Sequence, residues 1–318
     1  MKKCLIIGAG QLGSRHLQGL LKQKETQSIF VVDPSNESLE LSKQRAQEIQ
    51  HLHELTWCTD ISQVPAHIDL GIIATSANVR RKVVDQLLQQ VKIEYLILEK
   101  VLFQKLEDYS FIQNLLKEKN QQCWVNHPRR MFNCYAFLQS EIQKTDGLIT
   151  MKVEGNNWGL ACNGLHLLDL FQFLSSESVS SISNQWVDVN CFQSKRQGFV
   201  EFYGTIKAST DSGQACVISS HEGDPTPLRL TISKGEKHWT VQEGATITIT
   251  SSHNEEHSFA MQYQSELSSI LADEFFHEAN CSLPVYDESD ALHRQFIRAF
   301  LEIYNKGLET KTDILPIT

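Results

Sequence analysis

The chain has 318 residues, of which 41% are hydrophobic and 21% charged, with a formal net charge of −9 at pH 7. This length allows two domains with separate cores, and the composition is that of an ordinary globular protein. The negative charge argues against nucleic acid as a partner, because phosphate backbones are bound by clustered lysine and arginine. No apolar stretch approaches the length that spans a bilayer, so we also expect no membrane partner.

The cysteines and the basic residues are both scattered. Eight cysteines are widely spaced without a C-x-x-C pair, which predicts reduced thiols in a cytoplasmic protein. Short basic clusters occur at Arg80-Arg81-Lys82, Arg129-Arg130 and Lys195-Arg196. They are too dispersed for nucleic acid but are available to a small anionic substrate.

A short apolar strand at the start of the chain leads into a glycine turn. Gly8, Gly10 and Gly13 have the G-x-G-x-x-G/A-type spacing of a dinucleotide-binding turn. Gly8 allows the sharp turn, Gly10 allows close approach of a pyrophosphate, and Gly13 allows the next helix to pack against the sheet. We expect the free amides of that helix start, with Gln11 and Leu12 beside it, to face the phosphates.

A second strand over residues 29–32 ends at Asp33, which lies about 20 residues after Gly13 as a dinucleotide fold requires. Its carboxylate would accept hydrogen bonds from the ribose hydroxyls and repel a 2′-phosphate. The sequence therefore predicts NAD(H) as the cofactor, preferred over NADP(H). The alternative is a βαβ unit whose glycine-rich turn is incidental.

Strands and helices alternate as far as about residue 125. Expected strands end at Trp57, Thr75, Leu98 and Val125, with amphipathic helices between them. This alternation predicts a doubly wound parallel sheet, and ligands bind beyond the carboxyl ends of its strands. Thr75, Glu99, Lys100 and Asn126 fall at such ends. We place a Rossmann domain at residues 1–125.

The pattern changes from residue 126 onward. Helices are expected near 135–142 and over 163–174, with a strand at 148–154. Short alternating runs then fill residues 185–250, and two helices, over 263–279 and 289–304, finish the chain. We predict a C-terminal α+β domain at 126–318, with a large, mostly antiparallel open sheet.

These features together resemble a known family. The residues that carry the resemblance are Gly8–Gly13, Asp33, the strand end at Thr75, Glu99-Lys100, and Gly164–Asp169. The chain resembles the Gfo/Idh/MocA oxidoreductases over nearly its whole length. The resemblance implies a nicotinamide-binding Rossmann domain, a C-terminal domain with an open sheet, and oxidation or reduction of sugars and cyclic polyols.

The resemblance also implies roles for individual residues. Lys100 and His166 would be catalytic, Lys100 stabilising the substrate oxygen and His166 moving its proton. Thr75 and Glu99 would contact the cofactor. Substrate contacts are expected from the residues Arg129, Arg130, Cys162 and Asp169. The structural alternatives are a packed helix histidine, a surface lysine, solvated loop arginines and a helix-orienting aspartate.

Two positions depart from the family pattern. Val101 stands where the family commonly has proline, and valine is a poor substitute at a cis bond, which costs a non-proline residue about 3 kcal/mol. Cys162 stands where many members have an aspartate four residues before the histidine. A carboxylate that could contact the substrate or steady the imidazole is therefore missing.

We predict an NAD-dependent oxidoreductase that transfers a hydride to or from a hydroxyl or keto carbon of a sugar, sugar acid or polyol, with surface-glycan sugar metabolism as one setting. The alternative, motivated by Cys162 and Val101, is a catalytically weakened NAD(H)- or metabolite-binding regulatory protein. A third is a hydrolase or epimerase that uses bound NAD transiently.

Two further expectations concern assembly and metals. A homodimer or homotetramer through the open sheet is expected, because bare apolar sheet faces are rarely left in water. His253–His257 has the H-x-x-E-H spacing of a zinc peptidase. Because serines flank it and it links a strand to a helix, we predict no metal site there.

Overall fold

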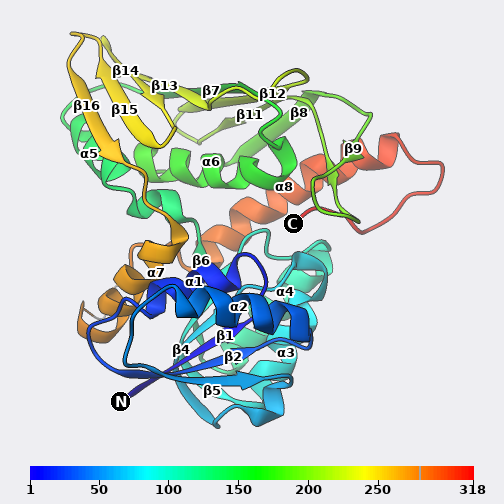
Figure 1. Ribbon diagram of the computed structural model, residues 1–318. Helices are drawn as coiled ribbons and strands as arrows, with labels where there is room; N and C mark the ends of the chain where they lie inside the picture. The colour runs from blue at the N-terminus through cyan, green and yellow to red at the C-terminus, as the bar shows by residue number, and fades with distance from the viewer. Residues whose placement is uncertain (279–280) are drawn as a thin grey trace. The chain divides into compact units, whose positions relative to one another are not determined.

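The computed structural model describes residues 1–278 and 281–318, which form two compact units (Figure 1). The first unit contains Met1–Phe103, Glu107–Pro128 and Gln262–Asp287. The second contains Gln104–Leu106, Arg129–Met261 and Glu288–Thr318. The units therefore interleave in sequence. The expected division at residues 125–126 lies close to one crossing, but residues 262–287, expected in the C-terminal domain, pack with the N-terminal part.

The first unit has a six-stranded, all-parallel sheet in the order β3-β2-β1-β4-β5-β6. Its strands are β1 (Lys2–Ile7), β2 (Gln27–Val32), β3 (Glu54–Cys58), β4 (His67–Ile73), β5 (Lys92–Glu99) and β6 (Gln122–Asn126). The order reverses between β1 and β4, which is the switch point of a doubly wound fold. The predicted Rossmann sheet is confirmed.

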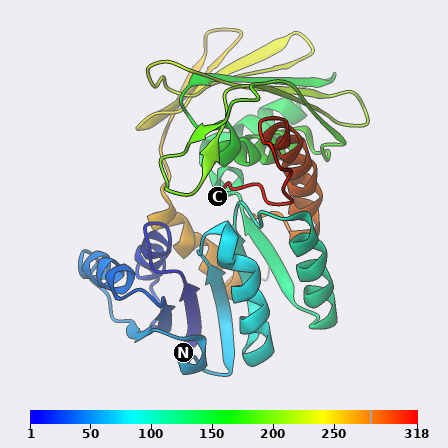
Figure 2. The same ribbon diagram turned by 90° about the vertical axis from the view of Figure 1, so that its right-hand side faces the viewer.

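Helices cover both faces of this sheet (Figure 2). They are α1 (Gly13–Leu20), α2 (Asn36–Gln47), α3 (Ala77–Gln90) and α4 (Leu106–Glu118). Short 3₁₀ turns occur at Ile61–Gln63 and Pro128–Met131. In α3 the buried positions include Val84, Leu87 and Leu88, which share one face at helical spacing.

The returning segment docks helix α7 (Gln264–Asp273) against α1. A Cβ on Gly19 would lie 2.6 Å from the Cβ of Ser268, so the two helices touch where glycine leaves room. A π-helical turn, Glu274–Glu278, follows and places Phe275 against Tyr95, with ring centroids 4.8 Å apart. The helix expected over 263–279 is thus shorter and changes winding, and its expected last residue lies outside the described residues.

The second unit has an eight-stranded sheet in the order β16-β15-β14-β13-β7-β12-β11-β8. Its strands are β7 (Ile149–Asn156), β8 (Ser181–Val187), β11 (Gly204–Ser209), β12 (Ala215–His221), β13 (Arg229–Lys234), β14 (Lys237–Gln242), β15 (Thr246–Ser251) and β16 (Glu256–Ala260). Neighbours are antiparallel except β7 and β12. A small pair, β9 (Phe192–Gln193) and β10 (Val200–Glu201), lies apart. The large, mostly antiparallel sheet is confirmed.

Helices α5 (Asn133–Gln143), α6 (Leu160–Ser175) and α8 (Tyr286–Lys306) belong with this sheet, and α6 lies against one of its faces (Figure 1). Close packing of α6 on α8 depends on Gly164, because a Cβ there would lie 3.1 Å from the Phe296 ring. Helix α6 begins three residues earlier than expected, which puts Cys162 inside its first turn.

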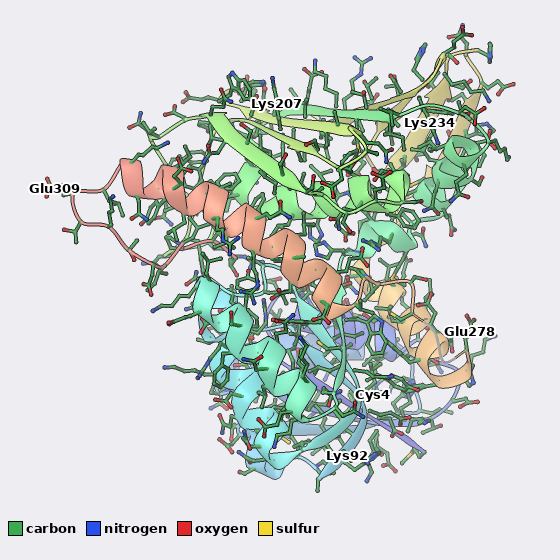
Figure 3. The ribbon with its side chains drawn as sticks, turned by 180° about the vertical axis from the view of Figure 1, so that it is seen from behind. Cys4, Lys92, Lys207, Lys234, Glu278 and Glu309 are labelled. Carbon is green, nitrogen blue, oxygen red and sulfur yellow. The ribbon has the colours of Figure 1, made fainter. Side chains whose placement is uncertain are left out.

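The other face of the large sheet is polar. On β7 the side chains that alternate with the buried ones are Thr150, Lys152 and Glu154, and all three are exposed. Lys207 of β11 projects from the same kind of position (Figure 3). The expected bare apolar face is therefore wrong, because the apolar residues of these strands point inward to the helices.

The structure also describes the cysteines and the His253–His257 segment. All eight cysteines are free thiols. The segment His253–His257 forms a turn and the start of strand β16 instead of a helix. Within the described ranges, no group of three metal-ligating side chains converges. No helix in those ranges has the length and apolar character needed to span a bilayer.

Candidate active site

The glycine turn has the geometry that its spacing predicts. Gly8 has φ +95°, and a Cβ there would lie 2.9 Å from the Thr75 amide nitrogen. A Cβ on Gly13 would lie 1.7 Å from the Gly8 carbonyl oxygen, so both positions exclude a side chain. Nothing lies within 4 Å of a Cβ built on Gly10. The backbone at Gly10 is therefore open to a ligand at the start of α1, where free amides favour phosphate.

Asp33 is fixed to the turn by two backbone amides. Its Oδ2 accepts a hydrogen bond of 2.7 Å from the Ala9 amide, and its Oδ1 accepts one of 2.8 Å from the Ser35 amide. Each carboxylate oxygen keeps a second lone pair for a ribose hydroxyl. The acid at the end of β2 is thus held in place before any ligand binds.

A cavity of about 430 Å³ opens beside the turn. It lies at the carboxyl ends of β1, β2, β3 and β4 and brings together the predicted residues Gly8, Gly10, Asp33 and Thr75. The other lining residues were not singled out as cofactor contacts from the sequence, and they are Ile7, Val32, Pro34, Thr59, Asp60, Ile61, Ala74, Ser76, Val79, Val83 and Gln86. Several of them directly follow strand ends, which is the signal that could have found them. Gln11, Leu12, Glu99 and Lys100 do not line this cavity.

The cavity has two features that suit a dinucleotide. The Thr75 hydroxyl oxygen is buried and has no hydrogen-bond partner among the described residues, so it can serve a bound group. The bare backbone at Gly10 leaves room for a pyrophosphate. The residues present therefore fit a nicotinamide dinucleotide, with Asp33 on the adenosine side.

Glu99 belongs to a buried polar network. Its Oε1 lies 2.8 Å from His16 Nε2 and accepts a 2.5 Å hydrogen bond from Asn126 Nδ2. His16 Nδ1 lies 2.8 Å from the Ser268 hydroxyl, so the network ties α1 to α7. Burial alone would raise the pKa of Glu99, but the bonds from His16 and Asn126 hold it below its ordinary value. His16 was not singled out from the sequence, because an amphipathic helix gives no sign of a buried partner.

Arg80 occupies the space between two strand ends. It is 1% exposed and donates to the carbonyl oxygens of Thr75, Val101 and Leu102. The Lys100–Val101 peptide bond is cis although residue 101 is valine, which corrects the expectation drawn from the missing proline. Arg80 is therefore a buried structural cation. Its position in a run of basic residues had suggested that it was available to an anionic substrate.

In the second unit, Cys162 and His166 lie one turn apart on α6, and both are partly exposed. The carboxylate of Glu201 caps this helix, accepting from the Ala161 amide at 2.8 Å and from the Cys162 amide at 3.0 Å. The carboxylate of Glu201, on β10, therefore satisfies two of the free amides at the start of α6.

The arginines expected at the substrate are both paired with carboxylates. Arg130 holds Asp169 through two bonds of 2.8 and 2.7 Å and also contacts Glu288. Arg129 holds Glu243 in the same two-pronged way, at 2.9 and 2.7 Å. The structure therefore brings Arg130 and Asp169 together as a buried ion pair. Either arginine could reach a substrate only with its remaining N–H groups.

Residues 2–127 match the model of an oxidoreductase family with an NAD-binding Rossmann fold, GFO_IDH_MocA. This part of the chain is a Rossmann domain of that oxidoreductase family. A search of curated proteins gives no match.

Solved structures share the fold of the whole chain. A putative NADPH-dependent oxidoreductase from Desulfitobacterium hafniense has a TM-score of 0.72 at 11% identity, covering 96% of each chain. A putative myo-inositol dehydrogenase from Sinorhizobium meliloti has a TM-score of 0.70 at 14% identity, covering 95% of this chain and 98% of that one. The transcriptional regulator Gal80p from Kluyveromyces lactis has a TM-score of 0.72 at 13% identity, covering 96% and 92%. At these identities the likeness shows the fold alone.

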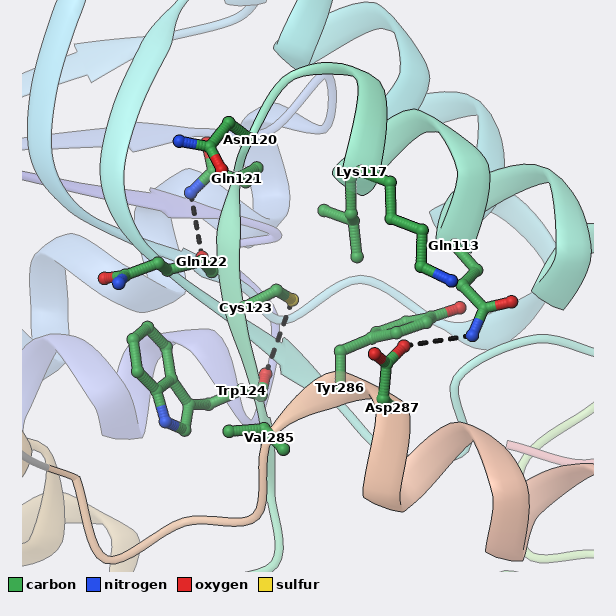
Figure 4. Close-up of a pocket in the computed structure, with 11 residues that line it drawn as sticks. Gln113, Lys117, Asn120, Gln121, Gln122, Cys123, Trp124, Val285, Tyr286 and Asp287 are labelled. Atoms are coloured by element: carbon green, nitrogen blue, oxygen red, sulfur yellow. Dashed lines mark hydrogen bonds between the residues drawn. The ribbon is translucent and has the colours of Figure 1, made fainter.

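The Rossmann domain has a second cavity, of about 330 Å³, at the amino end of β6 (Figure 4). Amide side chains and Lys117 line it together with apolar and aromatic residues such as Trp124 and Tyr286, and Gln113 Nε2 donates a 3.0 Å hydrogen bond to Asp287 Oδ1. Ligands of doubly wound sheets bind at the carboxyl ends of the strands. This cavity is at the opposite end of its strand, so it is not a candidate for the cofactor.

Proposed function

We propose that the protein is an NAD-dependent oxidoreductase that transfers a hydride to or from a hydroxyl or keto carbon of a sugar, sugar acid or polyol. The observation that carries the proposal is the cavity that gathers Gly8, Gly10, Asp33 and Thr75 at the carboxyl ends of the strands. The family model supplies the reaction class for this domain. The carbohydrate substrate is favoured by the likeness to a putative myo-inositol dehydrogenase.

We propose NAD(H) over NADP(H) because of Asp33. The carboxylate is held at the end of β2 by the Ala9 and Ser35 amides and would face the adenosine ribose. A 2′-phosphate there would meet a fixed negative charge. Since one structure of the same fold is called NADPH-dependent, this preference depends on Asp33 and not on the fold.

The bound nicotinamide would supply or accept the hydride, and side chains of the protein would transfer the accompanying proton. His166, on the partly exposed side of α6, is suited to exchange a proton with the substrate oxygen near neutral pH. Lys100, directly after β5, would donate a hydrogen bond to that oxygen as negative charge develops. Cys162 lacks the carboxylate common at its position, so the imidazole would act without that support.

The experiment is a scan of NADH or NAD with a panel of keto and hydroxy sugars, monitored by nicotinamide absorbance and by sugar analysis. Turnover of cofactor and sugar together supports the oxidoreductase. Altered sugar without net cofactor change would indicate a hydrolase or epimerase with transiently used NAD.

The second candidate is a regulatory protein that binds NAD(H) or a metabolite without turnover. Two observations favour it. The helix start near Cys162 is already occupied by Glu201, and both arginines expected at the substrate are paired with carboxylates. Gal80p, a transcriptional regulator, shares the fold. Saturable NADH binding with no turnover on the whole panel would favour this role.

We further propose a cytoplasmic homodimer or homotetramer formed through the open face of the large sheet. Its exposed Thr150, Lys152 and Glu154 would make such an interface polar and held by hydrogen bonds. Light scattering after gel filtration would measure the mass. A monomer at all concentrations would exclude this assembly.

A further inference from the structure

Arg80 is the most buried basic side chain next to the cofactor cavity. It belongs to α3, is 1% exposed, and is among the largest side chains buried in this way. Its Nη2 donates to the Thr75 carbonyl, and its Nη1 donates to the carbonyls of Val101 and Leu102, the latter at 3.0 Å. Its positive charge also helps to keep the pKa of Glu99 low.

These contacts join the ends of two neighbouring strands. Thr75 follows β4 and lines the cavity, whereas Val101 and Leu102 follow β5 and directly succeed Lys100. In the strand order, β2 lies on one side of β1 and β4-β5 lie on the other. Asp33 at the end of β2 marks the adenosine side. The ends of β4 and β5 are therefore on the nicotinamide side.

The arrangement depends on the shape of a guanidinium. Its planar fork presents several N–H groups in fixed directions, so one group can hold carbonyls from two separate segments. Lysine keeps the charge but places it on a single rotatable ammonium. The neighbouring Arg81 faces outward, with its guanidinium 3.7 Å from the Phe111 ring centroid and near Asp85 and Asp108. It is a matched control on the same helix.

We propose that Arg80 is a positioning residue that fixes the Thr75 carbonyl and the turn after Lys100, and thereby sets the binding of the nicotinamide half of the cofactor. The adenosine half depends on other groups, Gly10 and Asp33, which follow β1 and β2 on the other side of the switch point. The inference rests on the proposed cofactor site but not on turnover. It assigns to one buried arginine a role that its position in the run Arg80-Arg81-Lys82 conceals.

The test compares NADH with ADP-ribose, which lacks the nicotinamide, by calorimetric titration of the wild type, Arg80→Lys and Arg81→Lys. Arg80→Lys loses the fork that holds both segments, so NADH binding should weaken by roughly tenfold or more, a difference of about 1.4 kcal/mol or greater. ADP-ribose binding should change by less than about twofold, the scatter expected when no group that binds the ligand is altered. Arg81→Lys should leave both affinities unchanged.

Equal weakening of both ligands by Arg80→Lys, or no weakening of NADH, would overturn the proposal. If the lysine variant does not fold, Arg80→Gln, which buries no charge, should give the same contrast. Hydrogen exchange of the wild type adds a measurement independent of any variant. NADH should protect the amides of Leu102 and Phe103 and ADP-ribose should not, and equal protection also overturns the proposal. A wild type that binds neither ligand would instead refute the proposed cofactor site.

Discussion

The Ala9 amide donates a 2.7 Å hydrogen bond to Asp33 Oδ2, which joins the glycine turn to the acid at the end of β2. The same carboxylate accepts the Ser35 amide through Oδ1. A carboxylate held by two amides cannot swing away from an incoming 2′-phosphate. Cofactor selection is thus coupled to the conformation of the turn, and substitution of Asp33 should change both.

For the cofactor, the wild type should bind NAD(H) at least ten times more tightly than NADP(H), a difference of about 1.4 kcal/mol. Asp33→Ser should narrow that ratio because it removes the charge that repels the phosphate. Calorimetric titration with both cofactors measures it. Glu37→Ser removes a charge from an exposed position at the start of α2 and serves as the control. Equal wild-type affinities would contradict the preference.

For catalysis, His166→Ala should lower turnover by roughly 10²-fold or more, the usual contribution of general acid–base catalysis. NADH affinity should barely change, since every residue that lines the cofactor cavity belongs to the first unit. Cys162→Ala should have a much smaller effect, because a thiol is a weak hydrogen-bonding group and a poor substitute for a carboxylate. Steady-state kinetics and separate binding titrations check this, and full activity of His166→Ala would exclude the mechanism.

Gly10 and Gly13 of the turn should respond differently to alanine. Gly13→Ala puts a methyl group 1.7 Å from the Gly8 carbonyl oxygen, so it should destabilise the fold by about 3 kcal/mol. Gly10→Ala meets no atom within 4 Å and should keep a wild-type melting temperature. Its methyl group would nevertheless occupy the space of the pyrophosphate, so NADH binding should be lost. Thermal unfolding and NADH titration of both variants make the comparison, and tight NADH binding by Gly10→Ala would refute the assignment.

Acid should weaken the second unit through Glu243. Burial alone would raise the pKa of Glu243, but Arg129 and the Tyr135 hydroxyl hold it below the ordinary value of 4.5. A depressed folded-state pKa stabilises the protein above pH 4.5, and this contribution is lost as the pH falls through 4.5 toward the folded-state value. Urea unfolding at pH 7 and at pH 4 measures the loss.

Glu243→Gln should remove that part of the pH dependence. It should also destabilise the protein at pH 7 by roughly 3–5 kcal/mol, because Arg129 stays buried without its counter-charge. Glu141→Gln is the control, since this carboxylate is close to the surface and pairs with Lys144 in a solvent-screened salt bridge. A pH dependence in Glu243→Gln equal to that of the wild type would contradict the assignment.

The sequence predicts what local patterns determine. The alternation of apolar strands with amphipathic helices predicts the parallel sheet. The glycine spacing predicts the tight turn, and in the structure a Cβ at Gly8 or Gly13 would clash with neighbouring backbone. Side-chain contacts between residues far apart in the chain produce no local sequence pattern. Arg129 and Glu243 are 114 residues apart, and Glu201 caps a helix that begins about 40 residues earlier. No periodicity reports either contact.

Two expectations failed for different reasons. The run Arg80-Arg81-Lys82 is available to an anionic substrate by sequence, but Arg80 is buried and donates to three backbone carbonyls that only the fold brings near. The open sheet was expected to be apolar on its outer face. On β7 the buried residues instead alternate with the exposed Thr150, Lys152 and Glu154, a local pattern that the sequence already contains.

The return of residues 262–287 to the first unit determines when that unit can be completed. Ser268 contacts Gly19 and His16 of α1, and it is synthesised only after the strands of the second unit. A chain cut after residue 128 would leave His16 and Glu99 without the α7 side of their network and the Gly19 surface bare. Completion of the α1–α7 contact is therefore expected late in translation, after about nine-tenths of the chain has been made.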